Sequence, residues 1–296
     1  MNAKTEALQL QGAAGLIEAL LDRPADTPPK GTAVISHPHP LFGGTMQNKV
    51  VQTLARAFVL AGWNAVRYNF RGVGASAGTH DDGRGELEDL LQVIQQAAPQ
   101  GPLALAGFSF GAFVTANAMA RLTTAATPRV PEQLVLVGTA TSRFTVDPVA
   151  PDWHARTLVV HGEEDDVVPL ASVMDWARPQ SLPVTVVPGV GHFFHGQLPL
   201  LRQIVLRHLQ SAPVPSCFLS CSHPAGGRPC PVPHVHVPIP HLPLPGCPGS
   251  RCQPVRRNRH RHCPDRACGR LCRHCGQPAR RAAGCRGPLP PPSVRR

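Results

Sequence analysis

The sequence predicts an α/β fold in which helices cover both faces of a mostly parallel, doubly wound sheet. From residue 31 to about residue 209, short apolar runs alternate with longer segments whose apolar residues recur at helical spacing. The apolar runs lack the strict polar–apolar alternation of a strand with one solvated face, which indicates burial on both faces. Together these two patterns favour parallel strands joined by helical crossovers.

Each expected helix or strand ends where its apolar pattern stops or where a glycine or proline follows. In the helical segment 45–62, for example, Gly62 stands where a C-terminal cap belongs. Strands are expected at 32–38, 64–70, 103–107, 133–138, 157–162 and 184–189, and helices at 45–62, 85–98, 110–122, 170–177 and 197–209. Before them, residues 7–24 can form two antiparallel strands around Gly12–Gly15, although residues 16–21 fit a helix equally well.

Charge and composition divide the chain near residue 210. Residues 211–296 contain 14 arginines, no lysine and a single acid, Asp265, a formal charge of 14 − 1 = +13. Residues 1–210 carry 15 basic and 17 acidic residues, or 15 − 17 = −2. All ten cysteines lie at or after Cys217, and 18 prolines lie beyond residue 210, where no helical or strand pattern survives. We predict one domain, 1–210, followed by a disordered Pro/Arg/Cys-rich tail, 211–296.

Three interpretations of residues 211–296 compete. Cys272 and Cys275 have the spacing of zinc ligands, but the segment contains no second pair of this kind. The arginines could contact nucleic acid without sequence specificity. An excess of proline, arginine, alanine, glycine, cysteine and histidine is also what a GC-rich gene yields when it is read out of frame. We favour this frame-shifted extension over the two binding modules.

The first 210 residues give no sign of export or of membrane insertion. Their N-terminus lacks the basic flank, apolar run and cleavage site of a signal peptide, and no apolar stretch of about 18 residues occurs. Because these residues contain no cysteine, the fold needs no oxidising compartment. We therefore expect a cytoplasmic protein with no membrane partner.

The pentapeptide GFSFG, residues 107–111, has the G-x-S-x-G pattern of a nucleophilic serine. It joins an expected strand to an expected helix, and this strand–turn–helix context is what a nucleophile elbow requires. Gly107 and Gly111 provide the minimal side chains that the sharp turn needs. A structural serine in a glycine-containing loop is the alternative, but the context favours Ser109 as a nucleophile.

A serine nucleophile needs a general base and a group that orients this base, and both residue types follow later strands. Four acids follow the expected strand at 157–162 and two histidines follow the one at 184–189; they are Glu163, Glu164, Asp165, Asp166, His192 and His195. A solvated acidic loop and a surface histidine are the alternatives for each group taken alone. Their chain order, Ser then Asp then His, is that of the triad in α/β-hydrolases and favours a catalytic site.

Five separated motifs together resemble a small, lidless bacterial group of the α/β-hydrolase superfamily that is related to dienelactone hydrolases. In order, they are HPHPLFGGTMQNKVV, YNFRGVGASAG, AGFSFG, HGEEDDVVPL and GVGHFFHG, and the resemblance covers about residues 20–210. It implies an α/β-hydrolase fold without a large cap domain. Only 55 residues separate Ser109 from Asp165, which leaves no room for a large lid and predicts a shallow, open pocket.

The resemblance also implies roles for individual residues. The acid is the first residue of D-x-x-V-P, here Asp165, with Asp166 as the reserve candidate. The base is the histidine of G-x-G-H, here His192, and His195 is expected at the edge of the pocket. Dienelactone hydrolases use a cysteine as nucleophile, whereas this chain has Ser109.

Two backbone amides are expected to form the oxyanion hole, one directly after the nucleophile and one from the loop SHPHPLFGG. The first is the amide of Phe110. In the loop, Pro38 and Pro40 have no N–H, so His39 or Leu41 must donate, and we favour His39. The histidines of this loop have no acidic partner nearby in the sequence, so we expect no metal ion there.

These inferences predict a serine hydrolase that cleaves a carboxylic ester or thioester through an acyl-enzyme, with Ser109, His192 and Asp165 as its triad. No metal or organic cofactor is needed, and the expected partner is a small acyl substrate rather than nucleic acid. Two alternatives remain: a non-catalytic α/β-hydrolase scaffold used for binding, and nucleic-acid or zinc binding through residues 211–296. Fold and triad do not identify the acyl group or the leaving group.

Overall fold

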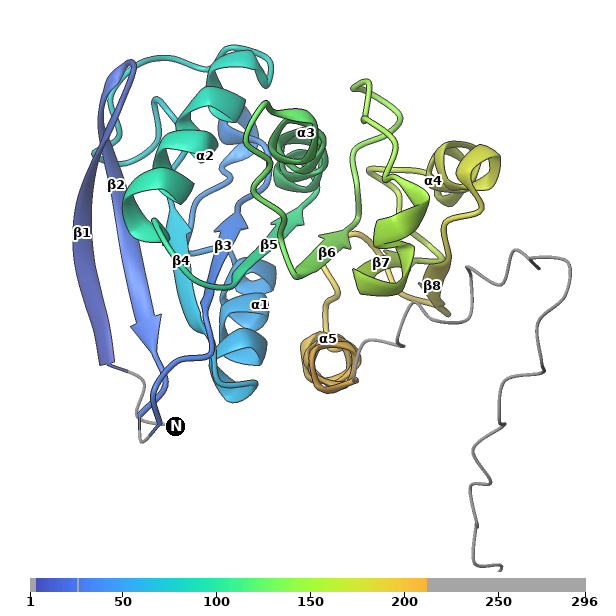
Figure 1. The fold of residues 1–296 in the computed structure, drawn as a ribbon. Coiled ribbons are helices and arrows are strands. Elements are labelled where there is room, and N and C mark those ends of the chain that lie inside the picture. Colours follow the sequence, from blue (N-terminus) through green and yellow to red (C-terminus); the bar gives the residue numbers. More distant parts are fainter. Residues whose placement is uncertain (1–3, 26, 212–296) are drawn as a thin grey trace, which may run out of the picture. The chain divides into compact units, whose positions relative to one another are not determined.

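The computed structural model describes residues 4–25 and 27–211 (Figure 1). The predicted tail beyond residue 211, with Cys272 and Cys275, lies outside these residues, so its predicted disorder stays a prediction. The strands are β1 (Lys4–Gly12), β2 (Gly15–Arg23), β3 (Thr32–Ser36), β4 (Asn64–Tyr68), β5 (Leu103–Phe108), β6 (Gln133–Val137), β7 (Thr157–Gly162) and β8 (Val184–Val187). The helices are α1 (Lys49–Leu60), α2 (Arg84–Ala97), α3 (Phe110–Thr124), α4 (Leu170–Ala177) and α5 (Leu198–Gln210), with short 3-10 helices η1 (Pro40–Phe42), η2 (Pro151–Arg156) and η3 (Arg178–Gln180).

The eight strands form one sheet in the order β1-β2-β4-β3-β5-β6-β7-β8. β2 pairs antiparallel with both β1 and β4, whereas every pairing from β4 to β8 is parallel. Each predicted strand and helix is present in the predicted order, with shifts of a few residues at the ends. The predicted mostly parallel sheet is therefore confirmed.

Residues 16–21, which fit a helix equally well in the sequence, lie in strand β2, so the helical alternative is wrong. Ile17, Ala19 and Leu21 are buried, while the residues between them are half-exposed, and this alternation is that of a strand. β1 and β4 supply hydrogen-bond partners on both sides of β2. This pairing with strands distant in the sequence favours a strand over a helix at residues 16–21. A pattern of six apolar residues carries no information about such pairing.

Helices cover both faces of the sheet, as the apolar strands predicted. α2, α3 and α4 pack on one face, and α1 and α5 pack on the other (Figure 1). The face under α1 and α5 carries several alanines of β3, β4 and β5, namely Ala33, Ala65, Ala104 and Ala106. No helix in the described ranges combines the length and the apolar character that crossing a bilayer requires.

Candidate active site

The site lies at the carboxyl ends of β3 and β5, which are neighbours in the sheet. α1 follows β3 and packs on one face, whereas α3 follows β5 and packs on the other. Where successive crossovers leave toward opposite faces, a crevice opens at the strand ends, and ligands bind there in open α/β sheets. The loop that carries His39 leaves β3 at this edge, and Ser109 follows β5.

Ser109 occupies the sharp turn between β5 and α3, directly before the first helical residue. Its backbone has φ 58° and ψ −118°, and a positive φ is uncommon for a residue with a side chain. Hydrogen bonds hold this conformation from both sides: the Ser109 amide donates to the carbonyl of Val137, and the Ser109 carbonyl accepts from Ala112 and Phe113. The turn therefore has the strained, over-determined backbone that is typical of functional sites.

Both glycines of the pentapeptide are required by close backbone contacts. A Cβ atom on Gly107 would overlap the carbonyl of Gly111, and a Cβ atom on Gly111 would overlap the carbonyls of Ser36 and His37. The start of α3 thus lies directly against the end of β3, which brings the loop after β3 close to Ser109. No residue larger than glycine fits at either position without a backbone shift.

We expect Gly111→Ala to lower the free energy of unfolding by about 3 kcal/mol, because the added methyl group meets backbone that cannot rotate away. Urea unfolding followed by tryptophan fluorescence measures this change. Gly191→Ala is the matched control, since a Cβ atom there has its nearest neighbour, the carbonyl oxygen of Glu164, at 3.6 Å. Equal stabilities of the two variants would contradict the packing described for the turn.

Ser109, His192 and Asp165 form a continuous line of hydrogen bonds. His192 Nε2 lies 3.0 Å from Ser109 Oγ, and His192 Nδ1 lies 2.7 Å from Asp165 Oδ2. All three residues are buried. Because a carboxylate only accepts, Nδ1 of His192 donates to Asp165 and Nε2 is left to accept the hydroxyl proton of Ser109.

The structure distinguishes Asp165 from its neighbour Asp166. The second carboxylate oxygen of Asp165 accepts the amides of Val167 and Val168 at 3.0 and 2.7 Å, whereas Asp166 is exposed. Burial raises the pKa of Asp165, but the hydrogen bonds from His192 and Val168 outweigh it, and the pKa lies below its usual range. Asp165 is therefore ionised at neutral pH, and it is the acid that contacts His192.

His161, at the end of β7, is a site residue that the sequence analysis missed. It is fully buried, and its Nε2 lies 2.9 Å from the carbonyl of Val168 and 3.4 Å from Asp165 Oδ2. Burial lowers the pKa of His161, so the ring is neutral and its Nε2–H points at the turn that carries Asp165. Its place two residues before the acidic cluster, in HGEEDD, was the available signal.

Aromatic rings hold the imidazole of His192 from two sides. The ring of Phe108 lies 4.9 Å from that of His192, and the ring of Phe193 lies 5.0 Å away, edge-on. His195 is exposed, contacts Phe193 and does not line the cavity at Ser109. The His192 ring thus keeps one orientation between Ser109 and Asp165.

The two amides favoured as oxyanion donors belong to Phe110 and His39, and both residues line the cavity at Ser109. Within the described part of the chain, the N–H groups of Phe110 and His39 donate to no acceptor. The amide of Leu41 instead donates to Nδ1 of His39 at 3.2 Å, so it is already engaged. Burial first, and then the nearby His80 and Arg143, lower the pKa of His39, so its Nδ1 keeps the lone pair that accepts this bond.

His37 anchors the loop after β3 to the backbone around it. Its Nδ1 lies 2.6 Å from the carbonyl of Pro38, and its Nε2 accepts the amide of Phe70 at 2.9 Å. The ring is fully buried, and this burial lowers its pKa to about 4. His37 is therefore a neutral structural residue whose two nitrogens are both engaged, and neither is free to bind a metal ion.

Lowering the pH from about 6.5 to about 4 is expected to destabilise the fold through His37. The unfolded chain takes up a proton on this imidazole over that range, whereas the folded protein holds it neutral down to a pKa of about 4. The unfolded state then binds more protons, so the free energy of unfolding rises with pH across this window, by up to about 3 kcal/mol.

Urea unfolding at several pH values, for wild type and His37→Gln, measures this dependence. Glutamine keeps an acceptor for the Phe70 amide but does not titrate, so the wild-type advantage should shrink as the pH falls. His195→Gln, which removes an exposed histidine, is the matched control. A wild-type advantage over His37→Gln that stays constant from pH 7 to pH 4 would contradict this role of His37.

A cavity of about 410 Å³ opens at Ser109 and His192. Its walls are largely apolar and aromatic, and they include Phe42, Phe110, Phe144, Phe193, Val167 and Val168. Phe42 and Phe193 are 73% and 42% exposed, so the cavity is open to solvent at an apolar rim, as a chain without a lid predicts. Among its lining residues, Arg143 is the one with a permanent charge. In residues 4–25 and 27–211, no three His, Cys, Asp or Glu side chains gather as metal ligands would.

Comparison with known proteins identifies relatives of this chain. A family model described as serine aminopeptidase, S33, matches residues 27–148, which include Ser109 but end before Asp165 and His192. An uncharacterized protein of Rickettsia prowazekii (strain Madrid E) is 31% identical over 201 residues, which cover 63% of this chain and 81% of that protein.

Two solved structures are similar over most of their length. A protein of Xanthomonas campestris, described as an α/β serine hydrolase without lid, is 35% identical with a TM-score of 0.62, over 72% of this chain and 99% of that one. An α/β serine hydrolase homologue from Coxiella burnetii is 39% identical with a TM-score of 0.57, over 69% of this chain and 97% of that one.

The chain therefore belongs to the α/β-hydrolase superfamily. Within this superfamily it is one of the small members without a lid, and the predicted fold class and family resemblance are confirmed.

Proposed function

We propose that the protein is a serine hydrolase that cleaves a carboxylic ester or thioester through an acyl-enzyme. The observation that carries this proposal is the hydrogen-bonded line from Asp165 through His192 to Ser109 at the floor of an open apolar cavity. In this proposal Ser109 is the nucleophile, His192 the general base and Asp165 the group that orients the base.

The proposed mechanism follows from the protonation states of the three groups. His192 Nε2 accepts the proton of Ser109 as Oγ attacks the acyl carbon, and the Asp165 carboxylate stabilises the imidazolium that forms. Collapse of the tetrahedral intermediate expels the alcohol or thiol, which takes the proton from Nε2. Water then attacks the acyl-enzyme with the same proton transfers and releases the acid.

The amides of Phe110 and His39 are the proposed donors to the tetrahedral oxyanion. Both come from segments whose backbone is held in place, Phe110 by the strained turn at Ser109 and His39 by the bonds of His37. Donors that are oriented before the reaction need no reorganisation as charge develops, and each is worth about 10²–10³ in kcat. The amide of Leu41 is the weaker candidate because it already donates to His39.

The lining of the cavity favours an acyl group without a free amine. An aminopeptidase needs an anionic group for the substrate's ammonium ion, and no carboxylate is among the residues that line this cavity. Arg143 would instead repel an ammonium ion, while Phe42, Phe144 and Phe193 offer apolar contact. An apolar or aromatic acyl ester or thioester fits this surface best.

Hydrolysis by the full-length chain of a matched substrate set tests the proposal. p-Nitrophenyl butyrate and benzoate should be cleaved, and 4-methylpentanoyl p-nitroanilide should be no worse a substrate than leucyl p-nitroanilide, which adds only the amine. Failure to cleave any of the esters would overturn the proposed reaction. A clear preference for the leucyl compound would replace it with an aminopeptidase activity.

A further inference from the structure

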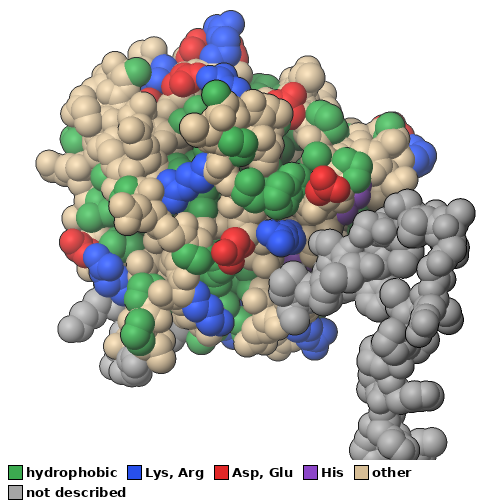
Figure 2. Space-filling model, viewed as in Figure 1, with side chains coloured by type: hydrophobic (Ala, Val, Ile, Leu, Met, Phe, Trp, Pro, Cys, Tyr) green, Lys and Arg blue, Asp and Glu red, His purple; other side chains and the backbone are tan. Residues whose placement is uncertain are grey.

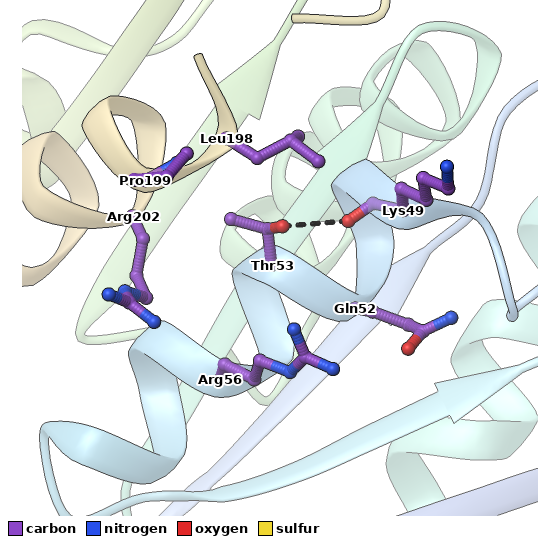
Figure 3. A pocket seen from close by; sticks show the side chains of 7 residues that line it. All are labelled: Lys49, Gln52, Thr53, Arg56, Leu198, Pro199 and Arg202. Carbon is purple, nitrogen blue, oxygen red and sulfur yellow. Dashed lines mark hydrogen bonds between the residues drawn. The ribbon is translucent and has the colours of Figure 1, made fainter. Parts of the chain in front are cut away.

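A second cavity lies between α1 and α5, on the sheet face that these two helices cover (Figure 3). Its volume is about 360 Å³, and it shares no lining residue with the cavity at Ser109. One face of α1 and the first turns of α5 line it, through Lys49, Gln52, Thr53, Arg56, Leu198 and Arg202, with Pro199. We call this space the α1–α5 groove.

The α1–α5 groove gathers positive charge without any compensating acid. Lys49, Arg56 and Arg202 line it, and no aspartate or glutamate does. In the described part of the chain, none of these three side chains forms a salt bridge or a hydrogen bond through its charged group, whereas Arg67 close by is paired with Asp22 at 2.9 Å. The three cations therefore have no acidic partner in the described part of the chain; Lys49 and Arg56 are exposed and Arg202 is half-buried.

On the face of the molecule shown in Figure 2, Lys and Arg side chains are interspersed with Asp and Glu. Like charges brought to one groove by helix packing repel one another and lower stability, unless an anion or salt screens them. An anion bound in the groove would offset the repulsion among Lys49, Arg56 and Arg202.

Two arginines, one from each helix, line the α1–α5 groove. In Figure 3, Arg202 extends from α5 toward α1, whereas Arg56 runs along α1 and Lys49 points away from both arginines. The same two arginines also line an adjoining cavity of about 390 Å³, together with Arg67 and its salt-bridge partner Asp22. Each guanidinium presents a planar fork of N–H donors that matches the oxygens of a phosphate group.

The remaining polar side chains of the groove, Thr53 and Gln52, each donate one hydrogen bond to a backbone carbonyl. The hydroxyl of Thr53 donates to the carbonyl of Lys49, and the amide nitrogen of Gln52 donates to the carbonyl of Gln47. The donors left for a ligand are the three cationic groups and the second N–H of the Gln52 amide. Because three of these four groups are positively charged, the groove favours an anion over a sugar or a neutral amide.

We propose that the α1–α5 groove is a binding site for a phosphate-bearing small molecule, held by Arg56 and Arg202 across the two helices and by Lys49 at one end. A diphosphate or a phosphate monoester has the oxygens that two forked donors from opposite helices require. A lone monocarboxylate would leave most of these donors unpaired. The site is separate from Ser109 and does not depend on the proposed hydrolase activity.

Thermal unfolding of the full-length chain with inorganic diphosphate tests the proposal. All three tryptophans, Trp63, Trp153 and Trp176, lie in the described part of the chain, so their fluorescence reports unfolding of this part rather than anion binding by the arginines beyond residue 211. Ionic strength is kept constant with sodium chloride, which separates specific binding from screening. A ligand that binds only the folded state raises the Tm in a saturable way.

We expect diphosphate to raise the Tm of the wild type, and Arg56→Gln, Arg202→Gln and the double variant to weaken the apparent affinity at least about tenfold each. Arg207→Gln is the matched control, because Arg207 is an exposed arginine on the same helix that lines neither cavity. Inorganic phosphate, tested in parallel, should bind more weakly than diphosphate.

Two results would overturn the proposal: no saturable rise for the wild type, or the same rise in the wild type and in both single variants. Without any anion at low salt, the double variant should unfold at the same or a higher temperature than the wild type, because like charges have been removed. The single variants keep the test in place even if the double variant does not fold. Loss of esterase activity has no bearing on this outcome.

Discussion

Replacement of Ser109 by alanine is expected to remove ester hydrolysis almost completely, by on the order of 10⁶-fold in kcat. The hydroxyl that lies 3.0 Å from His192 Nε2 is the group that we propose to attack the acyl carbon, and alanine provides no substitute. KM should change little, since the cavity walls are untouched. Initial rates with p-nitrophenyl butyrate, for wild type and Ser109→Ala at equal concentration, measure the loss.

Stability measurements separate this effect from a folding defect. Alanine has the same Cβ as serine, so the positive φ at residue 109 costs both residues the same and the Tm should stay close to that of the wild type. Ser142→Ala, at an exposed serine, is the matched activity control and should behave like the wild type. Substantial esterase activity in a folded Ser109→Ala variant would contradict the proposed nucleophile.

Asp165→Asn is expected to lower kcat by about 10⁴-fold while the fold is retained. An asparagine amide can donate to Nδ1 of His192, which favours the tautomer that carries its proton on Nε2, so Nε2 can no longer accept the proton of Ser109. The side-chain oxygen of asparagine can still accept one of the amides of Val167 and Val168, which supports the turn. Steady-state kinetics on a p-nitrophenyl ester measure the change.

Asp166→Asn is the matched control, because it makes the same chemical change one residue away on an exposed side chain. Its kcat should stay within about twofold of the wild type, as for surface substitutions in general. Equal losses in the two variants, or a larger loss in Asp166→Asn, would contradict the assignment of Asp165. This pair also decides experimentally between the two acids that the sequence left open.

The fold was largely predictable from the sequence because each parallel strand is an apolar run ended by a turn signal. The alternation of such runs with helical segments identifies the sheet and its two covered faces. The hairpin of β1 and β2 was left open, because residues 16–21 become a strand through pairing with β1 and β4. Strand pairing over long sequence distances cannot be read from a local pattern.

The proximity of Ser109, His192 and Asp165 was predictable, but the contacts that support them were not. Ser109, Asp165 and His192 each follow a strand, and parallel strand ends meet at one edge, so the sequence alone brings them together. His37 and His161 act through hydrogen bonds to backbone carbonyls and amides, and such bonds leave no periodic or spacing signal. The choice of His39 over Leu41 likewise depends on which amide is already engaged.

Some expectations from the sequence stay predictions. These expectations are the relation to dienelactone hydrolases, the cytoplasmic location and the thioester alternative. The zinc, nucleic-acid and frame-shift interpretations all concern residues beyond 211, which lie outside the described part of the chain.

Covalent labelling with a fluorophosphonate tests the central claim most directly, because such a probe reacts with a serine only when a base and an oxyanion site activate it. The intact wild-type chain should gain one label, and peptide mapping should place it on Ser109. Ser109→Ala and His192→Ala should gain none. An unlabelled wild type, or a label on any residue other than Ser109, would contradict the account.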